Sequence, residues 1–390
     1  MFSRCHRTAL LLGPLVAAAI STAAMAAPKL QVIYNFAGGS GDGANPVGPL
    51  LIDDRGSLYG TTTNGGSADD GTIFKISRRG QESVLHVFTG TSGDGSHPLG
   101  GVIADQSFNL YGATSGGGTN GLGVVFKLAP TGAETILHTF QGICCGSDGS
   151  FPYTSLVVDK QGNMFGTTMK GGNSSDLGTV FRITPTGTES LIHAFSGAMD
   201  GSEPLFGFAR GRKGIFYGAT GLGGDQDAGV AFRMTSDGTE TVLHQFGSGS
   251  DGQYAQGWIA LDDKGAMYGT TVNGGGGANA GIVYKIDKNG TESILHVFNG
   301  ADGENPVSVS LVGNDLYGIT SFGGANADGT VFKISSNGKF SVLHSFAGND
   351  GREPTCPLVA DSNGNLYGTT IGGGTNNNGV VFKLTLKKKG

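Results

Sequence analysis

The sequence predicts an all-β, seven-bladed β-propeller with four antiparallel strands in each blade. Three observations predict it: one unit is repeated seven times, each unit offers four short strands, and the chain ends are offset by one strand. The aromatic residue of a Leu-Tyr-Gly box recurs every 49 to 54 residues, at Tyr59, Tyr111, Phe165, Tyr217, Tyr268, Tyr317 and Tyr367. Self-similarity at a fixed period indicates a repeat architecture, and four-stranded blades repeated radially form propellers.

The four strands of the unit are clearest at 357–361, 365–370, 330–334 and 341–346, which are rich in Val, Ile, Phe, Tyr and Thr. An Asp-x-x-Gly turn joins the first strand to the second, and an x-x-x-Gly turn joins the third to the fourth. Both are typical of antiparallel hairpins. The other two connections are long, so every long loop is expected on one face of the molecule. The Lys or Arg that ends the third strand is expected to face the Glu that opens the fourth.

The chain ends favour a closed ring over a β-solenoid, which is the other repeat fold considered. After its first residues the chain begins with a fourth-type strand at 31–36, and it ends just after a third-type strand at 380–384. The N-terminal strand is therefore expected to pair with the last blade, which removes an open sheet edge.

The N-terminal segment 1–26 has the pattern of a secretory signal: Arg4 and Arg7, an apolar run, and Ala24-Met25-Ala26 as a cleavage site. We expect a propeller over 27–386 and a basic tail at 387–390. Losing Arg4 and Arg7 changes the formal net charge from −6 to −8. The sequence has no basic stripe of the kind that binds nucleic acid, so a nucleic-acid partner is not expected. No later apolar segment is long enough to span a membrane. The expectation is an exported monomer, periplasmic or extracellular.

Cysteine is scarce for an exported chain. Cys5 lies in the signal segment, Cys144 and Cys145 are adjacent, and Cys356 begins a first-type strand. Three remaining cysteines leave at least one thiol free or paired between chains. The pairing, including a vicinal disulfide at 144–145, stays open.

Two repeated polar positions are candidate sites. The fourth strand carries His86, His138, His193, His244, His296 and His344, with Tyr34 in the seventh copy. Each ring is expected to be a packing residue that bonds a neighbouring backbone group. An Asp-Gly pair in the long connector gives the second set, which is Asp42, Asp94, Asp148, Asp200, Asp251, Asp302 and Asp350. These carboxylates are interpreted as turn formers, with calcium binding near the channel mouth as the alternative.

The blades that depart most from the repeat supply the candidate ligand residues. The fourth blade has Arg210 and Arg212 near the position where others carry Asp, and the fifth holds Tyr254 and the single Trp, Trp258. His97 is the one mature histidine outside the fourth-strand box. Aromatic residues with a few polar groups are typical of a small-molecule or sugar site. Ordinary drift in a tolerant scaffold is the alternative interpretation.

The boxes LYGTT-x-x-GG, GTVFKI and ESVLHSF-x-G-x-DG-x-x-P resemble the Gloeo_Verruco (GloVer) tandem repeat of bacterial proteins, over about residues 30–386. The resemblance implies an exported protein and supplies no catalytic residue. The layout is similar, more distantly, to NHL-type propeller repeats, which implies the same blade phase and no function.

These observations favour a non-catalytic exported binding module. Its ligand would be a carbohydrate, another small molecule or a protein, held on the long-loop face. One alternative is a propeller lyase or hydrolase that uses groups such as His97 and Asp148 at the channel mouth. The other is a structural cell-surface protein.

Overall fold

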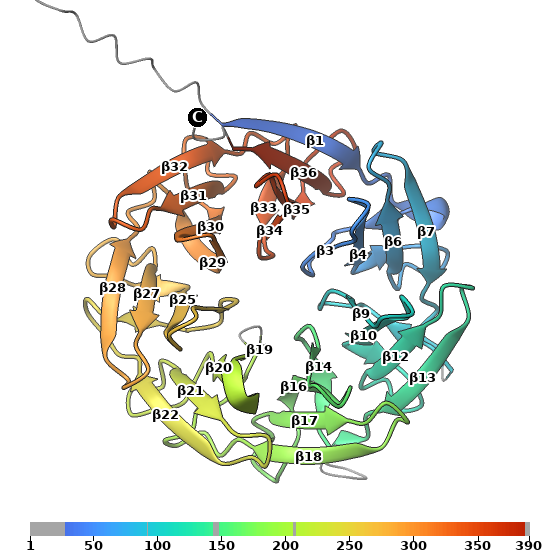
Figure 1. Ribbon diagram of the computed structural model, residues 1–390, viewed down its shortest axis with the longest axis horizontal. Helices are drawn as coiled ribbons and strands as arrows, with labels where there is room; N and C mark the ends of the chain where they lie inside the picture. The colour runs from blue at the N-terminus through green and yellow to red at the C-terminus, as the bar shows by residue number, and fades with distance from the viewer. Residues whose placement is uncertain (1–27, 92, 143–147, 206–207, 387–390) are drawn as a thin grey trace, which may run out of the picture.

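The computed structural model describes residues 28–386 apart from 92, 143–147 and 206–207. It confirms the seven-bladed propeller: seven antiparallel sheets stand side by side in a ring (Figure 1). The expectations for residues 1–26, for Cys144 and Cys145, and for 387–390 lie outside the described residues.

Each blade runs from an inner strand near the axis to an outer strand at the rim. Blade 1 has β3 (Leu51–Ile52), β4 (Leu58–Thr62), β6 (Thr72–Ile76) and β7 (Glu82–Val87). Blade 2 has β9 (Ile103–Ala104), β10 (Leu110–Thr114), β12 (Val124–Leu128) and β13 (Glu134–Thr139). Blade 3 has β15 (Val157–Val158), β16 (Met164–Lys170), β17 (Thr179–Ile183) and β18 (Glu189–Ala194). Blade 4 has β19 (Phe208–Arg210), β20 (Phe216–Ala219), β21 (Val230–Met234) and β22 (Glu240–Gln245).

The remaining blades repeat this order. Blade 5 has β24 (Ala260–Leu261), β25 (Met267–Thr271), β27 (Ile282–Ile286) and β28 (Glu292–Val297). Blade 6 has β29 (Glu304–Val312), β30 (Asp315–Phe322), β31 (Thr330–Ile334) and β32 (Phe340–Ser345). Blade 7 has β34 (Val359–Ala360), β35 (Leu366–Gly372), β36 (Val380–Thr385) and, as its outer strand, β1 (Lys29–Asn35).

Short accessory strands line the connectors. They are β2 (Gly43–Ala44), β5 (Asn64–Gly65), β8 (Gly95–Ser96), β11 (Gly116–Gly117), β14 (Ser150–Pro152), β23 (Gly252–Gln253), β26 (Asn273–Gly274) and β33 (Arg352–Pro354). The described chain also contains two 3-10 turns, η1 (Gly39–Gly41) and η2 (Arg212–Gly214). No described helix is long and apolar enough to cross a membrane.

The apolar residues of the repeated strand motifs pack against those of the neighbouring blade, which explains why the motifs recur in every blade. The Phe that follows each outer strand contacts the aromatic ring of the third strand in the next blade, with ring centroids 4.9 to 5.6 Å apart. The glycine of the Leu-Tyr-Gly box makes room for that ring, because a Cβ at Gly60 would stand 2.6 Å from Phe74 Cζ. The apolar core is therefore a ring of seven blade-to-blade contacts.

The expected closure is confirmed. Strand β1 pairs antiparallel with β36, with Leu30 opposite Leu384 and Val32 opposite Phe382. Phe36, which follows β1, is fully buried and contacts Phe74 of blade 1 at 5.0 Å. The first described strand thus joins the last blade to the first.

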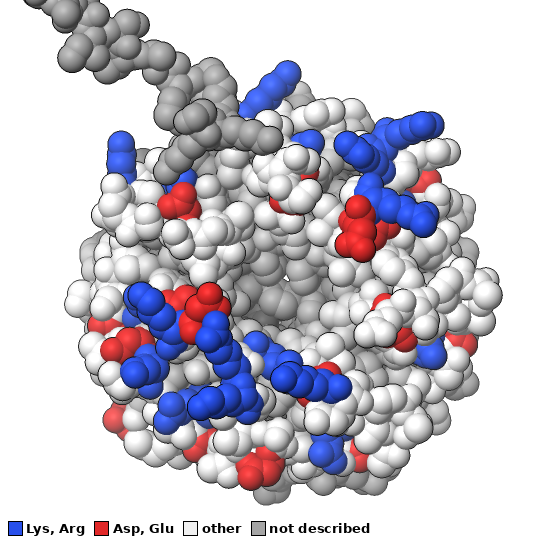
Figure 2. All heavy atoms as spheres, viewed as in Figure 1, with Lys and Arg blue, Asp and Glu red and all other residues white. Residues whose placement is uncertain are grey.

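The two faces of the ring differ in charge. We call the face with the tight first-to-second and third-to-fourth turns the short-turn face, and the opposite one the long-loop face. Of the described Lys and Arg residues, all but Lys170 and Arg352 come from the short-turn half of the blades. Figure 2 shows the short-turn face, hollowed at its centre, with basic side chains gathered over blades 4 and 5 and near the seam of blades 7 and 1.

Candidate functional site

The repeated His and Asp positions form one contact at each seam between blades. The seven pairs are Tyr34–Asp42 at 2.8 Å, His86–Asp94 at 3.2 Å, His138–Asp148 at 2.9 Å, His193–Asp200 at 3.3 Å, His244–Asp251 at 3.4 Å, His296–Asp302 at 2.9 Å and His344–Asp350 at 2.9 Å. The ring partner is therefore a carboxylate rather than the expected backbone group. The rings also pack edge-on against the Phe two residues later, as at His138 and Phe140.

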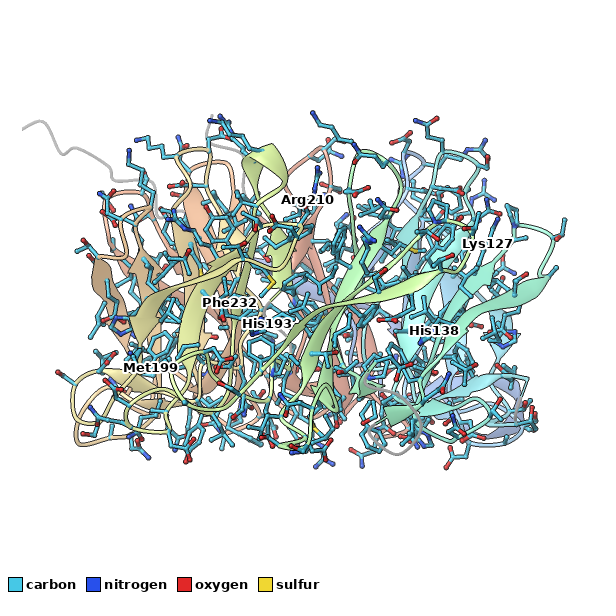
Figure 3. The ribbon with its side chains drawn as sticks, turned by 90° about the horizontal axis from the view of Figure 1, so that it is seen from below. Lys127, His138, His193, Met199, Arg210 and Phe232 are labelled. Atoms are coloured by element: carbon cyan, nitrogen blue, oxygen red, sulfur yellow. The ribbon has the colours of Figure 1, made fainter. Side chains whose placement is uncertain are left out.

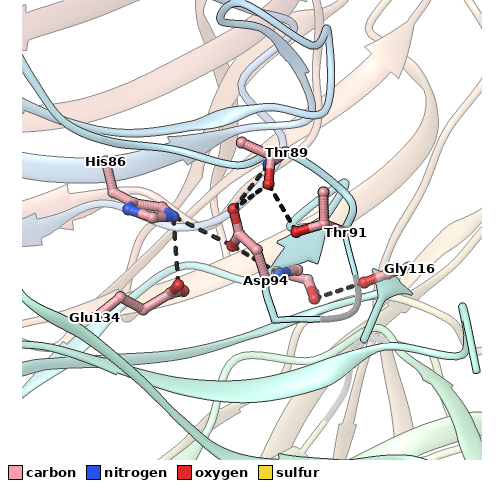
Figure 4. Close-up of polar contacts among 8 residues, drawn as sticks. His86, Thr89, Thr91, Asp94, Gly116 and Glu134 are labelled. Carbon is pink, nitrogen blue, oxygen red and sulfur yellow. Dashed lines mark hydrogen bonds and ion pairs between the residues drawn. The ribbon is translucent and has the colours of Figure 1, made fainter. Parts of the chain in front are cut away.

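The Asp at each seam holds the long connector in place. Asp94, for example, accepts the backbone N–H of Thr89 and Gly95 as well as its contact with His86 (Figure 4). This agrees with the interpretation of the Asp-Gly pair as a turn former. Each of the seven carboxylates contacts a His or Tyr of an outer strand. The outer strands form the rim of the ring (Figure 1), so the carboxylates are distributed around the rim rather than gathered at the axis.

Five of the outer strands open with Glu, and these Glu side chains behave differently from the expectation. Among the described residues, no Lys or Arg of a third strand lies within 4.0 Å of any of them. At three seams the Glu instead reaches back to the His and Asp of the preceding blade, as Glu134 does to His86 at 3.6 Å. Burial raises the pKa of Glu134 and Glu189 to about 7 and that of Glu240 to about 8. The outer strand of one blade thus carries a partly buried acid into the neighbouring seam.

Glu82 gives a prediction about pH. Burial, and then the charge of Asp42, raises its pKa to about 7 in the folded protein, against 4.5 ordinarily. The folded state therefore binds this proton more tightly than the unfolded state, so its contribution to stability falls as pH rises from about 4.5 to about 7. Glu82→Gln is expected to raise the melting temperature at pH 8 and to leave it nearly unchanged at pH 4.5.

The control for this prediction is Glu304→Gln, because Glu304 is an exposed acid on the long-loop face. Thermal melts of both variants at the two pH values check the prediction. A Glu82→Gln effect of equal size at both pH values would contradict it.

The five candidate ligand residues do not form one site. His97 and Tyr254 lie on the long-loop face at equivalent positions, with positive φ of 53° and 59°. Arg210 and Arg212 belong to the short-turn face, where Arg212 pairs with Asp263 at 2.7 Å. Figure 3 shows Arg210 toward one face and Met199 at the other. Trp258 is 7% exposed and packs between blades 5 and 6, where its backbone N–H donates to the Val307 carbonyl.

The main-chain hydrogen bonds explain the left-handed conformation of His97 and Tyr254. The His97 N–H bonds Asp70 of the preceding blade, and its carbonyl accepts from Ser115 of its own blade. The backbone of this residue links the two adjacent blades through these hydrogen bonds, so the side chain at this position is free to vary. His97 lies 3.6 Å from Asp70, and Asp148 lies with His138, so His97 and Asp148 do not meet.

The short-turn face carries a second repeated arrangement. In blade 7, Asp361 accepts the backbone N–H of Asn363 and Asn365 and the hydroxyl of Tyr367. The Lys383 ammonium lies over the Tyr367 ring, 5.6 Å from its centroid. Blades 1, 2 and 5 have the same Asp-Tyr-Lys arrangement. Each of these four blades thus places an ammonium and an aromatic ring beside a seam.

A polar pocket of about 350 Å³ opens on this face where blade 7 meets blade 1. Its lining includes Arg55, Arg78, Arg79 and Lys383, with Tyr367 at its wall. Within the described chain, no carboxylate lies within 4.0 Å of any of these four cations. The lining also contains two carboxylates, Asp54 and Asp361, and Asp361 is already engaged by its own turn and by Tyr367. The pocket therefore has an excess of positive charge.

One feature of the sequence distinguishes the repeat unit that forms this pocket. Arg78 and Arg79 are consecutive in a third-to-fourth turn, and the equivalent turns of the other blades have no such pair. The side chain of Arg78 crosses Gly56, where a Cβ would stand 3.8 Å from Arg78 Cδ. The turns at Gly56 and at Arg78 and Arg79 come next to residues 361–367 only when the ring is closed.

The fold defines a seven-bladed β-propeller whose blades are built from one tandem repeat. The model of the Gloeobacter/Verrucomicrobia repeat matches residues 16–225 and 206–390, so this chain belongs to that family. No curated protein matches the chain.

Several solved structures share the fold at low identity. A streptogramin B lyase is 15% identical, with 93% of this chain and 98% of that chain covered and a TM-score of 0.63. The computationally designed Ika8 protein is 15% identical, with 89% and 99% covered and a TM-score of 0.50. A gluconolactonase from Xanthomonas campestris is 13% identical, with 76% and 87% covered and a TM-score of 0.45. The similarities with TM-scores of 0.50 and above concern the propeller architecture.

Proposed function

We propose that this protein is an exported, non-catalytic binding module that holds an acidic carbohydrate in the pocket between blades 7 and 1. The observation that carries the proposal is the group of Arg55, Arg78 and Arg79 around one polar pocket without carboxylate partners. The pocket volume of about 350 Å³ lies within the range of small-molecule sites.

The chemistry of the lining favours a sugar that bears a carboxylate. A guanidinium binds a carboxylate through two parallel hydrogen bonds. Gln31, Asn363 and Asn365 add amide donors and acceptors suited to sugar hydroxyls. The ligand is thus assigned to the short-turn face rather than to the long-loop face expected from loop length.

Binding of a uronic-acid oligosaccharide, measured by isothermal calorimetry, tests the proposal. Arg78→Gln is expected to weaken binding by about tenfold, or about 1.4 kcal/mol, because it removes one charge-assisted contact. The matched control is Arg212→Gln, which alters an arginine of the same face that already pairs with Asp263. Its affinity should equal that of the wild type.

The comparison ligand is a neutral oligosaccharide of equal length, which should bind more weakly than the acidic one. Binding of the acidic ligand should also weaken as salt rises, because partly exposed charges are screened. Equal affinity for both ligands, or an unchanged affinity in Arg78→Gln, would overturn the assignment.

A further inference from the structure

Three of the seven seams bring a third ligand group to the His–Asp pair. The clusters are His86, Asp94 and Glu134; His193, Asp200 and Glu240; and His244, Asp251 and Glu292. Within each cluster one ligand atom per residue lies within 4.8 Å of the others. His and Asp come from one blade and its connector, and Glu comes from the outer strand of the next blade (Figure 4).

The distances separate these seams from the others. In the three clusters, His Nε2 lies 3.2 to 3.4 Å from the Asp oxygen and 3.4 to 3.8 Å from the Glu oxygen. At His138, His296 and His344 the corresponding His–Asp distance is 2.9 Å, an ordinary hydrogen bond. In these three clusters the imidazole thus lies between two carboxylates, instead of bonding one of them closely.

The wider spacing fits the edges of a coordination tetrahedron. Zinc binds imidazole nitrogen at about 2.0–2.1 Å and carboxylate oxygen at about 2.0–2.2 Å, which places two ligand atoms about 3.3 Å apart. The two distances at His193 are 3.3 and 3.4 Å. An ion could therefore be held with little movement of the three side chains.

The cluster at His193 also contains buried polar atoms that make no hydrogen bond. The Glu240 side chain is only 10% exposed, and its Oε1 makes no hydrogen bond. His193 Nε2 makes no hydrogen bond either, and the same holds for His244 Nε2 and Glu292 Oε1. Buried polar atoms without partners are costly, and a cation bound by these groups would satisfy them.

We propose that these three seams are binding sites for a divalent transition metal of the zinc type, which links each pair of adjacent blades at the rim. The nitrogen ligand favours zinc over calcium, which prefers oxygen. The site has three protein ligands, so water completes the coordination. The sequence suggested calcium at all seven Asp positions. This proposal replaces it with a zinc-type ion at Asp94, Asp200 and Asp251.

The other seams show what the third ligand contributes. The position equivalent to Glu240 is Phe340 beside His296, where the two rings stack at 3.5 Å, and Leu30 beside His344. Glu189 is present beside His138, but no oxygen of it lies within 4.0 Å of the ring nitrogen. The chain therefore supplies its own matched controls.

The experiment uses the chain without a polyhistidine tag, freed of metal by dialysis against a chelator. Zinc binding is measured by calorimetry and by elemental analysis after gel filtration, and cobalt(II) serves as a spectroscopic probe. The expected result is three ions per chain, a tetrahedral cobalt spectrum with nitrogen and oxygen ligands, and a higher melting temperature with zinc but not with calcium.

Glu240→Gln, which is nearly isosteric, is expected to reduce the bound ions from three to two, whereas Glu189→Gln leaves three. Equal stoichiometry in both variants would overturn the proposal. So would the absence of zinc binding, or a cobalt spectrum dominated by thiolate charge transfer, which would assign the ion to cysteine. Carbohydrate binding is measured separately, so either proposal can fail alone.

Discussion

A chain that begins at Ala37 is expected to lose the closed ring and to unfold at a much lower temperature than the intact protein. Removal of β1 leaves β36 as an open edge in blade 7. It also removes Phe36, which is fully buried against Phe74. Loss of a buried Phe side chain alone costs about 3–5 kcal/mol, so the whole strand should contribute more.

The exposed edge should also change the solution behaviour. Unpaired N–H and C=O groups of a sheet edge promote pairing between chains. Gel filtration of the shortened chain is expected to show oligomers, and calorimetry a lower and broader transition. A synthetic peptide of residues 28–37 should restore part of the stability by adding back the missing strand.

Two controls define this result. A chain that begins at Pro28 retains β1 and should behave as the longer protein does. Phe36→Ala retains the strand and should lose about 3–5 kcal/mol, whereas Phe322→Ala, at a side chain 40% exposed, should lose far less. An unchanged melting temperature for the chain beginning at Ala37 would contradict the closure.

Gly71→Ala is the second substitution with a large expected effect. Gly71 has φ +97°, and a Cβ there would stand 2.2 Å from the carbonyl oxygen of Thr62 and 2.9 Å from Pro98 Cδ. Its carbonyl also accepts the N–H of Phe88, so the backbone cannot move freely. The left-handed conformation alone costs a non-glycine residue about 1–3 kcal/mol, and the steric clash adds to it.

Chemical denaturation measures this effect as a loss of at least about 3 kcal/mol, combining conformational strain with the clash. The control is Gly277→Ala, because a Cβ at Gly277 has no neighbour within 4 Å. That variant should differ from the wild type by no more than about 0.5 kcal/mol. Equal stabilities of the two variants would show that the conformation of Gly71 is not required.

The overall architecture was predictable because the same pattern of strands and turns occurs seven times in the sequence. The spacing of the aromatic box gives the number of blades, and the two Gly-bounded turns give the hairpins. The offset ends predict that residues near Tyr34 pair with those near Phe382, as β1 and β36 do. Each of these inferences uses contacts within one unit or one end-to-end match.

The candidate sites were less predictable. The sequence singled out the His and Asp positions separately, but it did not show that His193 and Asp200 contact each other or that Glu240 joins them. Arg210 and His97 were grouped by their irregularity, although they belong to opposite faces. The pocket at Arg78 and Arg79 was missed because its walls come from the first and last blades.

The sequence alone determined the blade count, the strand order and the closing strand, because periodic apolar boxes and turn residues act locally. The tertiary structure alone decided which polar groups meet across the seams. Those contacts depend on the tilt of each outer strand against its neighbour and on the curvature of the ring. The sequence of a single repeat determines neither the strand tilt nor the ring curvature. The position of Glu240 beside His193 therefore became apparent only when the blades were assembled.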